Sequence, residues 1–227
     1  HIKHKEMIMK KICFITRHAI VNYGSFLQAY ALKQLIEELG YRVEFVDYHV
    51  GAPVIAENAD SKNKFVRKLE KGLETFQYQA PLSHKLSFIR YKQSFAKKYM
   101  PLLGIKDEMN YNPTLDCLVI GSDEVFNCIQ KNSNVGYSTE LFGKDNHADR
   151  LITYAASFGN TTLEKLEKYQ KASEVGNLLK EFDAISVRDA NSGSIVEQLT
   201  GEKPVYNLDP VLTYDYMNCC DRGPQIQ

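Results

Sequence analysis

The sequence lacks a long apolar segment and carries no excess of charge of either sign. No apolar run in its 227 residues approaches the roughly 20 residues that a membrane-spanning helix needs. Its 28 lysines and arginines are balanced by 28 aspartates and glutamates, so the formal net charge is zero. Nucleic-acid-binding domains usually show a basic excess. We therefore expect neither a spanning helix nor a nucleic-acid partner, although local basic patches are compatible with this average.

Cysteine is scarce, and its spacing excludes the common redox and metal motifs. The chain has 5 cysteines and no C-x-x-C pair. Cys13 and Cys117 lie in predicted strands, where buried free cysteine is common. Cys219 and Cys220 are adjacent, which is a poor geometry for a mutual disulfide. A reduced, cytoplasmic compartment fits this usage best.

Histidine and glycine are missing from the arrangements that mark several well-known sites. His18, His49, His84 and His147 stand apart, with no pair at metal-ligand spacing, so we expect no metal and no bound cofactor. The sequence has no G-x-G-x-x-G and no G-x-x-x-x-G-K-[ST], which are the phosphate-binding loops of dinucleotide enzymes and P-loop proteins. It also has no G-x-S-x-G nucleophile elbow.

What the sequence does contain is a β-α-β unit in residues 11–48. The run KICFIT (11–16) is short and rich in β-formers, so it predicts a buried strand. A helix follows Gly24, because Ser25 and Gln28 have the spacing of a capping box and Gly40 is the expected stop. RVEFVDY (42–48) then alternates as a second strand. This order of elements is typical of Rossmann-type folds.

Residues from about 50 to 112 interrupt this pattern with two basic amphipathic segments. These segments, 62–79 and 84–100, are separated by Pro81, and both have helical periodicity. The second has an apolar stripe of Leu86, Ile89 and Phe95. Either the stripes cover a sheet while the lysines face water, or a basic face meets an anionic acceptor or membrane headgroups.

Alternating strands and helices resume after this region. Strands are predicted in LDCLVI (115–120), LITYAASFGN (151–160), FDAISV (182–187) and KPVYNL (203–208). Helices are predicted over about 162–180 and between Arg188 and Gly201. The alternation predicts a Rossmann-like three-layer α/β/α domain with a mostly parallel sheet. We assign residues 10–213 to this domain, 1–9 to leader or tag residues and 214–227 to the start of a linker.

Polar residues occupy four loops at the edge where open α/β sheets bind ligands. These loops are 22–24, 121–124, 157–159 and 188–189. The first can aim helix N–H groups at an anion, or serve only as a turn and cap. Asp123 with Glu124 can supply a general base, or cap a following helix. Arg188 can clamp a carboxylate or phosphate, or form an ion pair with Asp189 or a neighbouring acid.

Five stretches follow one another in a distinctive order. They are NYGSFLQAYALKQLIEELGYRVEFVDY, DCLVIGSDEVFN, ITYAASFGN, FDAISVRDANSGSIVEQLTG and NLDPVL. Over residues 10 to 212 this order resembles the polysaccharide pyruvyl transferase family, with N-Y-G-x-x-L-Q-x-Y-A-L and G-S-D as the most distinctive motifs. The chain has Glu124 where glutamine is frequent, and Phe126 where tryptophan is frequent. An altered acceptor platform is compatible with these two departures, although Phe126 keeps an aromatic side chain.

The resemblance implies a two-lobed fold like that of GT-B glycosyltransferases, of which this chain holds the N-terminal lobe without the second. It implies transfer of a pyruvyl group from phosphoenolpyruvate to two sugar hydroxyls as a cyclic ketal, with no metal. Arg188 matches the family's S-V-R-[ED] arginine and would clamp the donor, while Asp123 would transfer a proton. The residues that would line the substrate cleft are Asn22, Tyr23, Gly24, Ser122 and Ser157.

Three functions stay open at this point. The first is a pyruvyl transferase of cell-surface or exopolysaccharide biosynthesis, whose partners are phosphoenolpyruvate and a lipid-linked or polymeric saccharide. This chain alone would be inactive, because it supplies half of a cleft. The second is a GT-B-type nucleotide-sugar glycosyltransferase, since one fold hosts both chemistries. The third is a non-catalytic half that acts through a partner chain. A homo-oligomer and peripheral contact with the inner face of the membrane are compatible with this reading.

Overall fold

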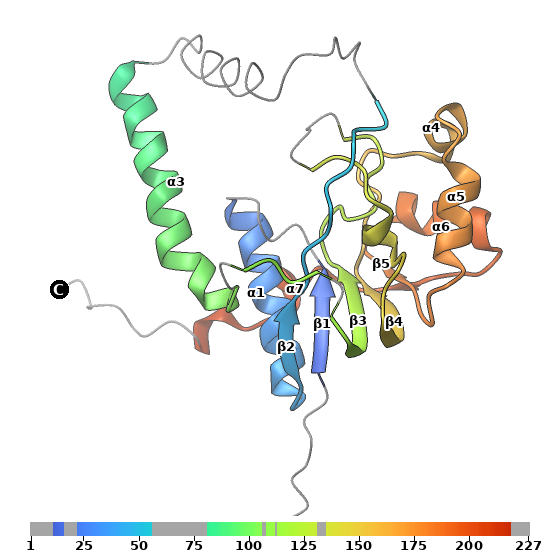
Figure 1. Cartoon of the computed structure of the whole chain (residues 1–227), viewed down its shortest axis with the longest axis horizontal. Coiled ribbons are helices and arrows are strands. Elements are labelled where there is room, and N and C mark those ends of the chain that lie inside the picture. The colour runs from blue at the N-terminus through green and yellow to red at the C-terminus, as the bar shows by residue number, and fades with distance from the viewer. Residues whose placement is uncertain are drawn as a thin grey trace, which may run out of the picture.

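A parallel sheet forms the centre of the chain (Figure 1). The computed structural model describes residues 11–15, 22–55, 81–105, 108–111, 113–130 and 135–218. Four strands lie in the order β2-β1-β3-β4. Their bounds are β1 Lys11–Ile15, β2 Arg42–Phe45, β3 Leu115–Gly121 and β4 Ala148–Tyr154. All of these strands pair in parallel, which confirms the predicted α/β class and mostly parallel sheet.

Two short strands continue the sheet beyond β4. β5 (Ser186–Val187) pairs in parallel with β6 (Val205–Tyr206). Isolated bridges from Ile152 to Ala184 and from Ala156 to Val187 join β5 to β4. The resulting order 2-1-3-4-5-6 makes β1 and β3 the switch point, because the chain leaves these neighbours toward opposite faces. A ligand crevice is expected at the carboxyl ends of these two strands.

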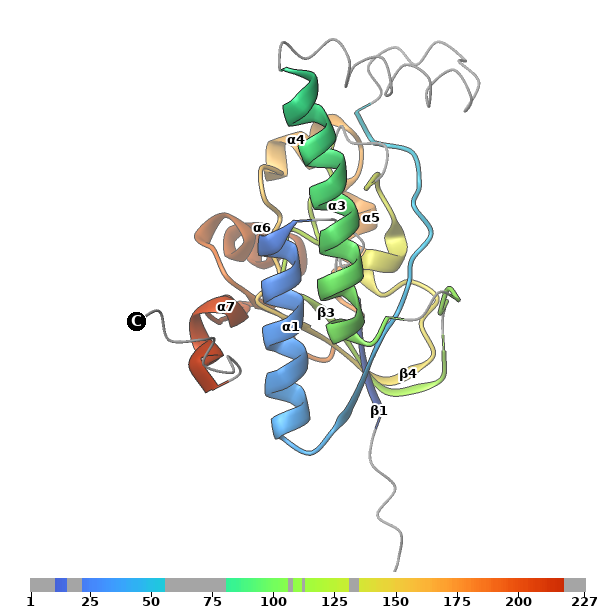
Figure 2. The same cartoon turned by 90° about the vertical axis from the view of Figure 1, so that its left-hand side faces the viewer.

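Helices cover both faces of the sheet (Figures 1 and 2). One face carries α1 (Tyr23–Glu38), α3 (Leu82–Leu103) and α7 (Pro210–Thr213). The other carries the 3-10 helix η1 (Thr139–Phe142), α4 (Leu163–Lys168), α5 (Ala172–Leu179) and α6 (Ala190–Thr200). A second 3-10 helix, η2 (Tyr216–Asn218), follows α7. Each face has its own apolar core, so the domain has the three layers that the sequence predicts.

The predicted long helix over about 162–180 is wrong, because the chain forms α4 and α5 with a turn between them. Gln170, in that turn, has a φ of 56°. Leu166 and Val175 are both fully buried in the same apolar core. Nine residues of one straight helix would turn these side chains to opposite faces. The break lets both of them face the sheet.

Helix α3 confirms the predicted helical segment 84–100, but its apolar stripe does not cover the sheet. Phe95 is buried against α1, whereas Leu86 and Ile89 are exposed. Only the carboxyl half of α3 packs, and its amino half projects past the start of α1 (Figures 1 and 2). The predicted segments 1–9 and 62–79 lie outside the described residues.

The state of Cys117 and the hydropathy of the helices bear on two expectations from the composition. Cys117 in β3 is outside any disulfide and half-buried, and its burial raises the pKa of the thiol. A raised pKa keeps the thiol protonated and unreactive near neutral pH. Across those ranges, no helix is long and apolar enough to cross a membrane.

Gly121 is the residue at which β3 meets the site loop, and we expect alanine to be poorly tolerated there. Its φ is 148°, and a Cβ would lie 2.1 Å from the Tyr154 carbonyl oxygen. Gly40 has a φ of 85° with nothing within 4 Å of a Cβ, so Gly40→Ala isolates the backbone cost, about 1–2 kcal/mol. Gly121→Ala should lower the free energy of unfolding by about 1–3 kcal/mol more. Urea unfolding of both variants measures this difference, and equal losses would contradict the expected clash.

Candidate active site

The loop after β3 is fastened to helix α1 by Ser122. The Ser122 hydroxyl donates to Gln28 Oε1 at 2.6 Å, and its backbone N–H donates to the same oxygen at 3.3 Å. Gln28 in turn donates from Nε2 to the Ser25 carbonyl at 2.9 Å. Ser122 is 0% exposed. In this conformation it holds the loop against α1, and its contact with a substrate stays a prediction.

Asp123, the next residue, lies at the carboxyl edge of β3 with both carboxylate oxygens engaged. Oδ1 accepts the Glu124 N–H at 2.8 Å, and Oδ2 accepts the Ser25 hydroxyl at 3.3 Å. Ser25 belongs to the first turn of α1, whose positive dipole end favours a nearby carboxylate. The side chain is partly exposed. Asp123 therefore occupies the switch-point crevice between β1 and β3.

Arg188 leaves the end of β5 and reaches two carboxylates. Its Nη1 is ion-paired with Asp209 Oδ2, and its Nη2 lies 3.7 Å from Asp123 Oδ1. Asp209 also caps α7 by accepting the Val211 N–H at 3.0 Å. The arginine thus does form an ion pair, with Asp209 and Asp123 rather than with its neighbour Asp189. A quarter of its side chain is still exposed to solvent.

Ser157 and Asp189 join the loop after β4 to helix α6. The Ser157 hydroxyl donates to Asp189 Oδ2 at 2.7 Å and accepts the Gly159 N–H at 3.0 Å. Asp189 Oδ1 accepts the Ser192 N–H at 2.8 Å, which makes Asp189 the N-cap of α6. Ser157 is buried. Its hydroxyl positions this loop, and its predicted role in substrate binding is untested.

The start of α1 differs from the predicted capping box. Asn22, rather than Ser25, is the N-cap, because its Oδ1 accepts the Gly24 N–H at 2.8 Å. The Ser25 hydroxyl and the side-chain oxygen of Gln28 bind the loop after β3 instead, at Asp123 and Ser122. Asn22, Tyr23 and Gly24 are all exposed at this edge. The turn-and-cap reading of this motif is confirmed, and its role as an anion site stays a prediction.

The four predicted loops therefore meet at one edge of the sheet. The Ser157 N–H donates to the Asp123 carbonyl at 3.2 Å, and the Phe126 N–H donates to the Ser157 carbonyl at 3.1 Å. Asp123, Asp209 and Arg188 together carry two negative charges and one positive charge. This edge offers carboxylates for proton transfer and a guanidinium that can exchange a carboxylate for an anionic ligand.

A comparison with families of known proteins matches residues 22–224 to the family described as polysaccharide pyruvyl transferase. The chain belongs to the polysaccharide pyruvyl transferase family. The match spans all of the loops that meet at this edge. No curated protein and no solved structure matches the chain.

The family's aromatic position after the G-S-D motif does not form an acceptor platform in this chain. Phe126 is 0% exposed, and it stacks on Phe142 with ring centroids 4.6 Å apart. The ring of Phe126 is therefore part of the apolar core.

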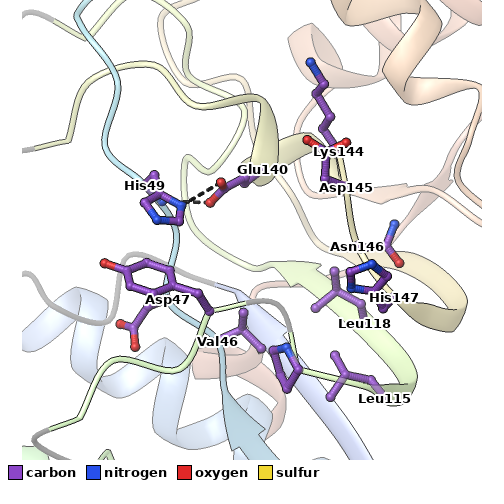
Figure 3. Close-up of a pocket in the computed structure, with 12 residues that line it drawn as sticks. Val46, Asp47, His49, Leu115, Leu118, Glu140, Lys144, Asp145, Asn146 and His147 are labelled. Carbon is purple, nitrogen blue, oxygen red and sulfur yellow. Dashed lines mark hydrogen bonds and ion pairs between the residues drawn. The ribbon is translucent and has the colours of Figure 1, made fainter.

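A hollow on the face of β3 opposite α1 is a separate feature (Figure 3). It has a volume of about 80 Å³ and includes His49, Glu140 and Tyr111 in its lining. His49 Nδ1 lies 2.8 Å from Glu140 Oε1, and its ring stacks on Tyr111 at 4.1 Å. None of the predicted site residues lines this hollow. Within the described ranges, no group of three histidine, cysteine, aspartate or glutamate side chains could hold a metal ion.

Proposed function

We propose that this chain takes part in the transfer of a pyruvyl group from phosphoenolpyruvate to hydroxyls of a saccharide. The observation that carries the proposal is the family match, which covers the loop at Asp123 and the strand end at Arg188. The charged cluster at the switch point supports it, because this is where ligands bind in open α/β sheets. The acceptor would be a lipid-linked or polymeric saccharide of a cell-surface polysaccharide. Phosphoenolpyruvate is a cytoplasmic metabolite, so the reaction would take place there.

The proposed reaction needs acid and base groups and an anion clamp. Two hydroxyl oxygens of the sugar form bonds to the enol carbon of phosphoenolpyruvate, and the bond from that carbon to the phosphate oxygen breaks. One proton from the hydroxyls ends on the methylene carbon, which becomes a methyl group. The other leaves with inorganic phosphate. No electrons are exchanged with an outside oxidant or reductant.

Asp123 is the group that we assign to proton transfer. It is partly exposed at the crevice, and its Oδ2 accepts only a long hydrogen bond from Ser25 at 3.3 Å. An incoming sugar hydroxyl can replace that bond and lose its proton to the carboxylate. Arg188 lies next to it and would bind the carboxylate or phosphate of the donor. Because Arg188 is now paired with Asp209, donor binding requires the guanidinium to turn at least one N–H away from that carboxylate.

The test is a turnover assay of the intact protein. With phosphoenolpyruvate and saccharide acceptors, we expect inorganic phosphate to appear in a phosphorus NMR spectrum. An equal amount of ketal methyl signal should appear in the proton spectrum. Phosphate release without the ketal signal would contradict pyruvyl transfer. A nucleotide sugar that is consumed in place of phosphoenolpyruvate would support the glycosyltransferase alternative. Lack of turnover with both donors, together with tight binding of a partner chain, would support the non-catalytic alternative.

A further inference from the structure

A row of aromatic side chains runs from the start of α1 onto the projecting half of α3. We call Tyr23, Tyr91 and Phe88 the aromatic row. The ring centroids of Tyr23 and Tyr91 are 5.8 Å apart, and those of Tyr91 and Phe88 are 6.3 Å apart. Tyr23 is 47% exposed and Phe88 is 50% exposed. Neighbouring aromatic rings that stay open to solvent are a common mark of a binding surface.

The helix geometry explains why this row is open. Phe88, Tyr91, Phe95 and Tyr99 are spaced by three or four residues, so they lie along one side of α3. In the carboxyl half of the helix, this side packs on α1, where Phe95 meets Phe26. Beyond Tyr23 there is no α1 left to cover it, because the amino half of α3 extends past the start of α1 (Figures 1 and 2). Phe88 belongs to this half of α3 and is exposed. Folding of the core therefore does not account for the aromatic residue at position 88.

Positive charge flanks the same side of α3. Lys92 Nζ lies 4.7 Å from the centroid of the Phe88 ring, and Lys98 Nζ lies 5.2 Å from that of Tyr99. The helix contains further lysines and an arginine and has no aspartate or glutamate, although the whole chain has zero net charge. A local excess of this kind favours an anionic ligand.

The aromatic row also leads directly to the candidate active site. Tyr23 and Ser25 belong to the same first turn of α1, and Ser25 donates to Asp123 at 3.3 Å. One end of a saccharide bound on the aromatic row would therefore reach the carboxylate of Asp123. Phe126 cannot serve as an aromatic platform at this edge, because its ring is buried.

We propose that the aromatic row and Lys92 bind the saccharide acceptor, and that this acceptor is anionic. The C–H faces of its sugar rings stack on Tyr23, Tyr91 and Phe88, whose ring faces carry partial negative charge. Its carboxylate or phosphate groups pair with Lys92. This inference rests on the proposed function for its substrate class, but its test measures binding and needs no turnover.

The test measures binding of anionic oligosaccharides to the full-length protein by titration calorimetry, without phosphoenolpyruvate. The probes are an oligogalacturonate, which carries carboxylates, and a phosphorylated mannan oligosaccharide. A malto-oligosaccharide is the neutral control. The variants are Phe88→Ala and Lys92→Gln on the row. Leu86→Ala and Lys97→Gln are the matched controls, since both are exposed on α3 and lie about half a helical turn away from Phe95.

We expect at least one anionic probe to bind more tightly than the neutral one, and the stronger probe identifies the anionic group. Phe88→Ala and Lys92→Gln should each raise its Kd by about tenfold, whereas the two control variants should change it less than about twofold. Equal effects of all four variants would overturn the proposal, as would equal binding of the neutral probe. Absence of saccharide binding, with capture by vesicles of anionic phosphatidylglycerol, would overturn it in favour of a membrane surface. If binding follows the expected pattern but pyruvyl transfer fails, the proposed function fails alone.

Discussion

Replacing Asp123 by asparagine should lower kcat for pyruvyl transfer by about 10²–10⁴-fold in the full-length protein, the usual contribution of a general base. Asparagine has nearly the same shape, and its side-chain oxygen can still accept from Ser25 or the Glu124 N–H. The fold and the KM for phosphoenolpyruvate should therefore change little. Steady-state rates with phosphoenolpyruvate and the acceptor measure the effect.

Asp149→Asn is the matched control for this substitution. Asp149 is exposed at the start of β4, at the opposite end of the strand from the site. It should leave kcat within about twofold of the parent value. If the Asp123 variant keeps the parental rate, Asp123 is no more than a partner of Ser25 and Arg188, and the proton is transferred by another group.

Replacing Arg188 should mainly weaken the use of the donor, phosphoenolpyruvate. We expect Arg188→Ala to lower kcat/KM for phosphoenolpyruvate by on the order of 10²–10³-fold, since a lost charge-assisted pair costs several kcal/mol. Arg188→Lys keeps the charge but loses the two-pronged geometry of the guanidinium. It should therefore recover only a small part of the lost kcat/KM for phosphoenolpyruvate. Donor binding by phosphoenolpyruvate titration separates the loss of affinity from the loss of rate.

The free energy of unfolding of the Arg188 variants has to be measured together with donor binding, because Arg188 also neutralises Asp123 and Asp209. Its removal leaves two carboxylates facing each other at a partly buried edge. Arg150→Ala is the control, since Arg150 is largely exposed and pairs with Asp183 at 3.5 Å. A variant at position 188 that loses stability but binds phosphoenolpyruvate normally would restrict Arg188 to the structural ion pair.

The order of strands and helices could be predicted from the sequence because its signals are local. Gly40 and Gly201 both take the left-handed conformation that ends a helix, as their positions after α1 and α6 indicated. The turn at Gln170 could not be predicted in this way, because its effect is to bury Leu166 and Val175 in the same apolar core. Their shared core is a tertiary feature that helical periodicity does not contain.

The candidate site was partly predictable for the same reason. The position of Arg188 at a strand end followed from its apolar neighbours, but its partner Asp209 is 21 residues away and is brought near by β6. Ser25 and Gln28 were missed as site residues because their spacing also fits a capping box. The G-S-D motif was the available signal, since its serine and aspartate need partners and α1 is the nearest helix.

The pairing of β1 with β3 affects how the chain folds while it is being synthesised. The Lys11 N–H donates to Asp116 Oδ2 across 105 residues of sequence. At typical rates of translation, β3 leaves the ribosome roughly 5–20 s after β1. Until then the inner edge of β1 is open to other nascent chains, and open strand edges promote aggregation. Slower initiation or added chaperone, rather than a more stable native state, is therefore the expected route to a high yield of folded protein.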